Sequence, residues 1–133
     1  MAYTSTGTLS VISLLANGAL PLENTLIHIR GGDEENRFVE FSLLTDRDGV
    51  TGSVRLPAPD RALSLSPSAP EQPYASYDVM AYADGYYPKT VRGVAVFSGV
   101  DAVLPIYMIP KVDGEPYPRG NLYGKVVENP NLE

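Results

Sequence analysis

The groups in this sequence that could do chemistry are carboxylates, tyrosine hydroxyls and a single imidazole. The 133 residues contain no cysteine and one histidine, His28. The absence of cysteine excludes disulfides, zinc–thiolate centres and cysteine nucleophiles. One histidine cannot supply a histidine cage for a metal, and acid–base catalysis by His28 would need an oriented partner in a cleft. Because His28 falls on the outer face of the strand predicted around it, we expect an exposed side chain.

A serine or threonine nucleophile would have to be activated by His28 or by a lysine. The sequence holds no Gly-x-Ser-x-Gly motif, and Gly52-Ser53 lies in a strand context instead of at a strand-to-helix elbow. Together with the missing cysteines, this pattern predicts that the chain is not an enzyme and carries no cofactor.

The carboxylates offer a weak calcium candidate. Asp46 and Asp48 flank an arginine before Gly49, and oxygen ligands at alternate positions resemble the start of a calcium loop. Such a loop needs a bidentate glutamate at its twelfth position, where Asp60 would have to serve. The competing interpretation is a hairpin turn, which we favour, so we predict no metal site beyond this weak candidate.

Tyrosines are the most suggestive side chains. The sequence has nine of them, against three phenylalanines and no tryptophan, and five gather in one stretch: Tyr74, Tyr77, Tyr82, Tyr86 and Tyr87. Exposed rings could stack on sugar faces or line a protein interface. We expect Tyr77 and Tyr86 to fill the core or cap a sheet edge. Strand parity places Tyr82 on the face opposite to that of Tyr77, so its ring should point outward. The candidate binding residues are therefore the three remaining tyrosines of this stretch, Tyr74, Tyr82 and Tyr87.

Charge and hydropathy restrict the partners. The formal net charge is −6 and the lysines are well separated, so the sequence lacks the basic patch that nucleic acid requires. No apolar run approaches the roughly 18 residues that span a bilayer, so we expect no membrane insertion. Residues 1–7 lack the basic and apolar regions of a signal peptide, and the localisation stays open on these grounds.

Dense turn signals predict an all-β domain. Twelve glycines and twelve prolines divide the chain into short segments, and none shows a sustained helical period. Alternating apolar residues predict seven strands, at 8–15, 25–30, 37–45, 50–56, 77–82, 89–97 and 102–109. Seven short strands with regular turns indicate a β-sandwich. Pro105 within the last strand favours an edge position or a bulge.

Prolines gather in two segments, one inside the predicted domain and one after it. Residues 57–73 carry five prolines and are either a functional loop or a connection between the sheets, and we weigh the two evenly. We expect residues 1–6 to be loosely held, residues 7–110 to form the sandwich, and residues 111–133 to be a proline-containing linker or tail. The terminal Leu132-Glu133 resembles a cloning scar, so we expect the chain to come from a longer protein.

Five segments stand in the order found in a known superfamily. They are Gly7–Val11, Ala19–Ile29, Thr45–Thr51, Tyr77–Pro88 and Leu104–Pro110. Together they resemble the carboxypeptidase-regulatory, transthyretin-like (prealbumin-like) superfamily, which includes B-type repeats of surface proteins. Segments Leu56–Asp60 and Glu71–Tyr74 are similar to N-terminal segments of clostridial spore cortex-lytic and peptidoglycan-binding proteins.

The resemblance implies an all-β, seven-stranded Greek-key β-sandwich of the transthyretin/prealbumin-like type. It also implies a non-catalytic accessory or structural domain that contacts neighbouring domains or another protein. The parent would be a larger protein of the bacterial cell envelope or the spore. The alternative that we keep is a carbohydrate- or peptidoglycan-binding module that uses the exposed tyrosines.

Overall fold

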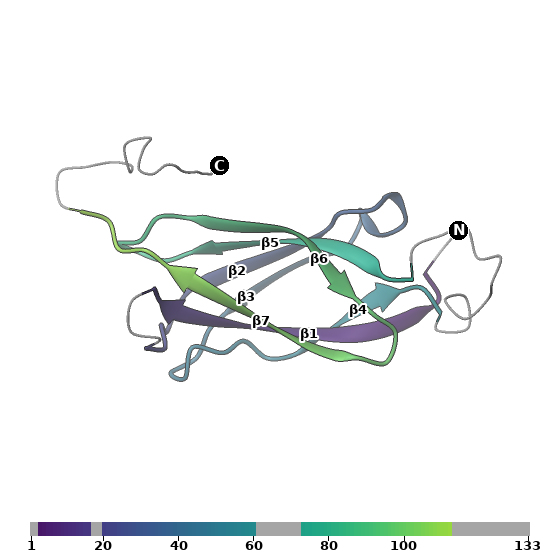
Figure 1. Cartoon of the computed structure of the whole chain (residues 1–133), viewed down its shortest axis with the longest axis horizontal. Helices are drawn as coiled ribbons and strands as arrows, with labels where there is room; N and C mark the ends of the chain where they lie inside the picture. The colour runs from purple at the N-terminus through teal and green to yellow at the C-terminus, as the bar shows by residue number, and fades with distance from the viewer. Residues whose placement is uncertain (1–2, 17–19, 61–72, 113–133) are drawn as a thin grey trace.

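Two β-sheets packed face to face make up the computed structural model, which describes residues 3–16, 20–60 and 73–112 (Figure 1). Along the chain the elements are β1 (Ser5–Leu15), β2 (Leu26–Gly31), the 3₁₀ helix η1 (Glu34–Asn36), β3 (Glu40–Leu44), β4 (Val54–Ala58), β5 (Ala75–Tyr82), β6 (Lys89–Val96) and β7 (Asp101–Met108). One sheet has three strands, in the order β4-β1-β7, and the other has four, in the order β3-β2-β5-β6. The predicted seven-stranded β-sandwich is therefore confirmed.

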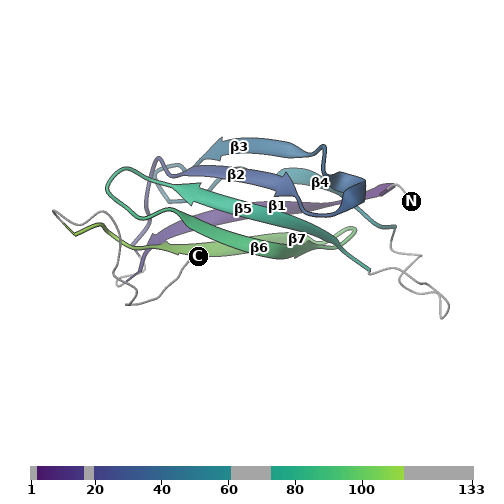
Figure 2. The ribbon, with the colours of Figure 1, turned by 90° about the horizontal axis from the view of Figure 1, so that it is seen from above.

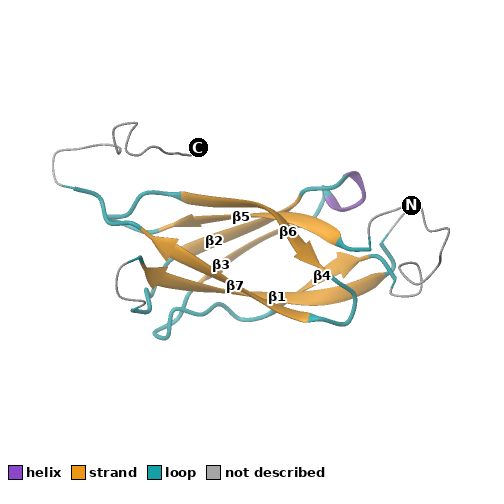
Figure 3. Ribbon diagram, viewed as in Figure 1, coloured by secondary structure: helices purple, strands orange, loops and turns teal. Residues whose placement is uncertain are grey.

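Seen from above, the strands of the four-stranded sheet lie side by side in the order β3, β2, β5 and β6, and the three-stranded sheet overlaps with them (Figure 2). Strands make up most of the described chain (Figure 3). Adjacent strands are antiparallel except β1 and β7, which run parallel from Thr8–Asp101 to Leu15–Met108. Within the described ranges, no helix is long and apolar enough to span a bilayer.

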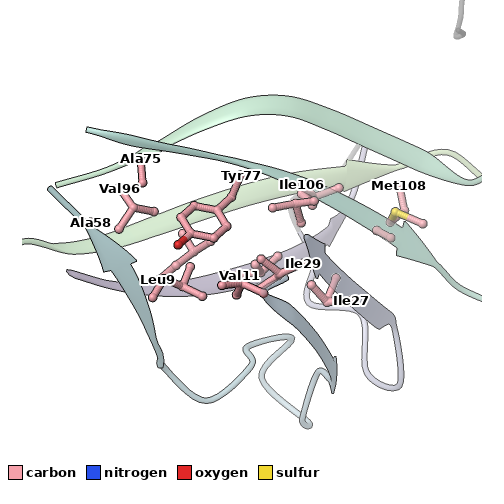
Figure 4. Packing of buried hydrophobic residues seen from close by; sticks show 14 residues of the cluster. Leu9, Val11, Ile27, Ile29, Ala58, Ala75, Tyr77, Val96, Ile106 and Met108 are labelled. Carbon is pink, nitrogen blue, oxygen red and sulfur yellow. The ribbon is translucent and has the colours of Figure 1, made fainter. Parts of the chain in front are cut away.

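Alternation of side chains explains why these segments form strands. In β5, Tyr77, Val79 and Ala81 are fully buried, whereas Tyr82 faces outward and is 44% exposed. The inward residues of both sheets meet in one core, shown with its labelled members in Figure 4. Burying a side chain the size of valine or isoleucine contributes about 1.5–3 kcal/mol, so this inner layer is the main source of stability.

The sheet edges carry features that discourage pairing with another strand. Pro105 lies in β7 and Pro57 in β4, and both strands are at edges of the three-stranded sheet. The edge position of Pro105 confirms the prediction. Pro57 requires a correction, because β4 continues through it to Ala58 instead of ending at Leu56; an edge strand tolerates proline since one side of its ladder is unpaired. Strand β1 begins at Ser5, ahead of the predicted start of the sandwich at Gly7.

Most of the proline-rich segment predicted as a loop, residues 61–72, lies outside the described residues, as do residues 113–133. The similarity carried by Glu71–Tyr74 is therefore described only at Pro73 and Tyr74.

A network of buried hydroxyl groups links the sheets at one end of the sandwich. Ser13 Oγ in β1 lies 2.8 Å from Thr25 Oγ1, which precedes β2. The Thr25 amide donates to Thr45 Oγ1 at 2.9 Å, and the Thr45 hydroxyl donates to the Leu22 carbonyl at 2.7 Å. Ser13, Thr25 and Thr45 are all buried, so each unpaired group would carry a desolvation penalty. The network therefore fixes the connection that crosses from β1 to β2.

Tyr77 links the sheets near the other end. Its ring is fully buried, and its hydroxyl donates to the Pro57 carbonyl of β4 at 2.6 Å. This arrangement confirms that Tyr77 belongs to the core. Burial of the phenol disfavours its charged form and raises the pKa of Tyr77 from its ordinary value near 10 to about 12.

We expect Tyr77→Phe to lower the free energy of unfolding by about 1 kcal/mol at neutral pH, because the Pro57 carbonyl loses its donor. The loss should shrink at high pH. Since the unfolded phenol ionises near pH 10 and the folded one near 12, the contribution of Tyr77 is complete below pH 10 and declines as the pH rises through this window. Urea unfolding of both proteins between neutral and alkaline pH measures this difference. A difference that stayed constant with pH would contradict it.

The turn before β4 requires a glycine for two reasons. Gly49 has φ +76°, and a Cβ placed there would lie 2.6 Å from the Ser13 carbonyl oxygen. That carbonyl accepts a hydrogen bond from the Leu22 amide at 2.9 Å, so it cannot move freely. Gly85 has a similar φ of +84°, but no heavy atom would lie within 4 Å of its Cβ.

Gly49→Ala should therefore destabilise the protein more than Gly85→Ala. The second substitution carries only the cost of a left-handed residue, about 1–2 kcal/mol, whereas the first adds the contact with Ser13. Chemical denaturation of the two variants provides the comparison. Equal losses would show that the contact is relieved without cost.

Candidate functional site

An open cleft lies at the end of the sandwich where β5 ends and β2 begins. Its volume is about 610 Å³. Four chain segments meet there: the β1–β2 connection, the start of β2, the β5–β6 connection and the residues after β7. The lining residues are Leu22, Glu23, Asn24, Leu26, Tyr82, Ala83, Asp84, Tyr86, Pro88 and Lys111. Apolar side chains with a few polar groups are the usual composition of a ligand site.

One wall of the cleft is the turn between β1 and β2. Asn24 has φ +64°, a left-handed conformation that asparagine tolerates better than most residues, and its amide donates to the Thr45 carbonyl at 3.0 Å. The carbonyl of Leu22 accepts the hydrogen bond from Thr45 Oγ1. The buried hydroxyl network thus holds this wall in place from below.

The opposite wall is the β5–β6 connection together with the segment that leaves β7. The Tyr86 amide donates to the Ala83 carbonyl at 3.1 Å and closes the turn. The Lys111 amide donates to the Gly85 carbonyl at 2.8 Å, and the Tyr87 amide donates to the Ile109 carbonyl at 2.9 Å. The chain leaving the three-stranded sheet is therefore held against the four-stranded sheet, and Lys111 is positioned at the cleft.

The three candidate tyrosines do not share one surface. Tyr82 lines the cleft, and its register partner on β2 is Leu26, which is 41% exposed. Tyr74 precedes the other end of β5, where its ring centroid lies 5.4 Å from that of Phe97. Tyr87 follows β5 near the cleft but is not among the lining residues. Tyr86 is half-buried, packs against the core and also lines the cleft.

Sequence reasoning missed the polar members of the cleft: Glu23, Asn24, Asp84 and Lys111. Glu23-Asn24 and Asp84-Gly85 are turn signals, so both could be recognised as loops. Nothing in the local sequence indicates that these turns and Lys111 meet at the same end of the sandwich.

His28 lies on the outer face of the four-stranded sheet, as alternation predicts, but its side chain is half-buried instead of fully exposed. Its Nε2 is 3.0 Å from Glu40 Oε2, and its Nδ1 is 3.3 Å from Ser42 Oγ; both partners are on β3. A base beside a hydroxyl group is an element of nucleophilic catalysis. Here the three groups lie on an open sheet face and outside the cleft, so the imidazole and the cleft tyrosines belong to separate surfaces.

Asp46 acts within its own turn. One of its carboxylate oxygens, Oδ1, accepts hydrogen bonds from the amides of Asp48 at 2.9 Å and Val50 at 3.1 Å. Among the described residues, no group of three or more acidic, histidine or cysteine side chains could hold a metal ion. The weak calcium candidate at Asp46 and Asp48 stays a prediction, and the geometry favours the hairpin-turn interpretation of the segment.

Comparison with known proteins identifies the fold. No family model matches the sequence, and no curated protein matches it. Among solved structures, the TIE protein of Bacillus anthracis matches 80% of this chain at 18% identity with a TM-score of 0.54. The 3-chlorocatechol 1,2-dioxygenase of Rhodococcus opacus matches 83% at 13% identity with a TM-score of 0.57. The minor pilin GBS52 of Streptococcus agalactiae matches 86% at 14% identity with a TM-score of 0.52.

The dioxygenase matches correct one prediction. The expectation that this protein is not an enzyme is wrong, because it relied in part on a fold thought to be non-catalytic. Several further matches are catechol 1,2-dioxygenases as well. At these identities the likeness shows the fold alone, so the fold no longer argues against catalysis.

The chain spans 17% of the TIE protein, 62% of the chlorocatechol dioxygenase and 49% of the pilin. The matched fold is thus one part of each of these longer chains. The conclusion that the comparisons support is structural: this chain is a β-sandwich of two sheets.

Proposed function

We propose that the domain is an accessory binding module of a larger protein and that the outer face of its three-stranded sheet docks an adjoining polypeptide. One observation carries the proposal. On β7, Val103 is 57% and Tyr107 is 45% exposed, and Pro105 between them is exposed as well. Ile12 and Leu14 of β1 lie beside Pro105 and Tyr107 in the register of the sheet and are half-buried. These five residues form the outer apolar face.

Physical reasoning favours an occupant for this face. Parallel strands are usually covered on both sides. Here the part of the outward side of β1–β7 that pairs Ile12 and Leu14 with Pro105 and Tyr107 is apolar, and no described residue covers it. Contiguous exposed apolar residues mark interaction sites in soluble proteins. Because Pro57 and Pro105 interrupt the edges of the same sheet, contact through the face is more favourable than strand addition.

The occupant that we propose is the polypeptide that follows Val112. Strand β7 supplies three of the five residues of the outer apolar face, and the chain continues from its end through Ile109 and Val112, both exposed and apolar. Residues 113–133 continue the chain from Val112, five residues beyond Tyr107 of the outer apolar face. The pilin and the TIE protein, in which the matched fold is one part of a longer chain, support this modular role. The sequence resemblances extend the proposal to a protein of the bacterial envelope or spore.

A second candidate function is carbohydrate or peptidoglycan recognition. The observation that favours it is the position of Tyr82. Its partly exposed ring lies in a cleft beside polar side chains that have no partner among the described residues. This surface is separate from the outer apolar face, because Tyr82 belongs to the four-stranded sheet.

Cysteine labelling tests the docking proposal, since the natural sequence has no cysteine. Val103→Cys reports on the outer apolar face, and Thr90→Cys, on exposed β6 of the other sheet, is the matched control. The strands and the core of the described residues lie within residues 3–112, so we expect a chain ending at residue 112 to fold. We expect maleimide to react with Val103→Cys about tenfold more slowly in the 133-residue chain than in the chain that ends at residue 112. The reason is that docking leaves the thiol accessible only in the undocked fraction.

The control thiol at position 90 should react at the same rate in both proteins. Equal rates at position 103 would overturn the proposal. Slowing that depends on protein concentration would identify a second copy as the occupant and would overturn it as well.

A further inference from the structure

We propose that the cleft binds a neutral saccharide, with one sugar ring stacked on Tyr82. This inference deepens the second candidate function and rests on it. Of the three tyrosines predicted as binding residues, only Tyr82 lines this cleft.

The floor of the cleft suits the apolar face of a sugar ring. Tyr82 is 44% exposed and Leu26 beside it 41%, so both present apolar surface to solvent at the point where β5 and β2 pair. Tyr86 and Pro88, on the β5–β6 connection, also line the cleft. An amphipathic ring such as tyrosine covers apolar C–H groups with its face and keeps its hydroxyl free for a polar partner.

The polar rim suits the hydroxyl groups of a sugar. Glu23 and Asp84 supply acceptors, Lys111 supplies donors, and the Asn24 amide supplies both. None of these four side chains makes a hydrogen bond or ion pair with another side chain or backbone group in the described part of the chain. Sugar hydroxyls donate and accept at once, so they can pair with every member of this mixed set.

The charges of the rim select against acidic sugars. Two carboxylates, Glu23 and Asp84, face one ammonium group, Lys111, so an anionic ligand would meet net negative charge in the cleft. The whole chain adds to this effect with a net charge of −6. A neutral ring avoids the repulsion and retains the hydrogen bonds.

The rim is ordered before any ligand arrives. The backbone of Asn24 is held by its hydrogen bond to Thr45, and that of Lys111 by its hydrogen bond to Gly85. Binding therefore needs to order only side chains, which lowers its entropic cost. The open shape leaves room for a longer chain to continue past the bound ring, so the end or the side of a polysaccharide can enter.

The test uses the whole chain with chitotriose and cellotriose as neutral probes and trigalacturonate as the acidic probe. Backbone amide signals should shift on titration at Asn24, Tyr82 and Asp84, and trigalacturonate should bind more weakly. Tyr82→Ala should weaken binding of the neutral probe about tenfold, the upper range for one aromatic contact. Tyr74→Ala is the matched control, because it removes a tyrosine at the far end of β5 and should leave the affinity unchanged.

Thermal melting of Tyr82→Ala establishes that the variant folds, which the exposure of the side chain predicts. Two results would overturn the proposal. One is the absence of shifts at the cleft with both neutral probes at millimolar concentration. The other is equally strong binding of the simple phenol p-cresol, which would identify an apolar pocket without preference for sugars.

The result of the sugar titration does not depend on whether the docking proposal is correct. Val103→Ser alters the outer apolar face of the three-stranded sheet and should leave the affinity for the neutral probes unchanged. Sugar binding without docking, or docking without sugar binding, would each identify which of the two proposals fails.

Discussion

The hydrogen bond between Ser13 and Thr25 joins the two sheets at the end where the cleft forms. Both hydroxyl groups are buried, and Thr45 extends the network to the carbonyl of Leu22. Hydrogen bonds in a dry interior are strong when complete and costly when broken, so the network favours one arrangement of the connection. That connection carries Glu23 and Asn24 into the rim, and the cleft therefore depends on groups that do not face it.

Much of the fold could be predicted because a half-buried strand records its burial with a period of two. In the strand predicted at 25–30, Thr25, Ile27 and Ile29 alternate along the sequence, and all three are buried. The same argument placed Tyr77 inside and Tyr82 outside. It failed at Pro57, because whether a proline can remain in a strand depends on whether that strand is at a sheet edge. Edge position is a property of the assembled sheet and cannot be read from one segment.

The candidate site was predicted only in part, for a related reason. Parity identified Tyr82 as exposed, and the predicted strand at 77–82 already places Tyr74 before its start and Tyr82 at its end. Lys111 lies about 90 residues after Glu23 in the sequence. It reaches the same cleft because β7 runs parallel to β1, so both strands end at the same end of the sandwich. A single sequence contains no signal for this parallel pairing, so the resemblance supplied the architecture and the structure supplied the cleft.

The dioxygenase and pilin matches show why the function must be argued from surfaces instead of the sandwich itself. The core that Tyr77 and its neighbours form would serve either kind of protein equally well, since a folded scaffold does not determine the chemistry placed on it. In this chain, two surfaces lie on either side of the segment that leaves β7. Val103 and Tyr107 face outward from the three-stranded sheet, while Lys111 is held against Gly85 at the cleft. A ligand in the cleft and a polypeptide on the outer apolar face would therefore contact neighbouring parts of one short stretch of chain. The segment from Ile109 to Val112 therefore connects the two proposed surfaces, which belong to different sheets.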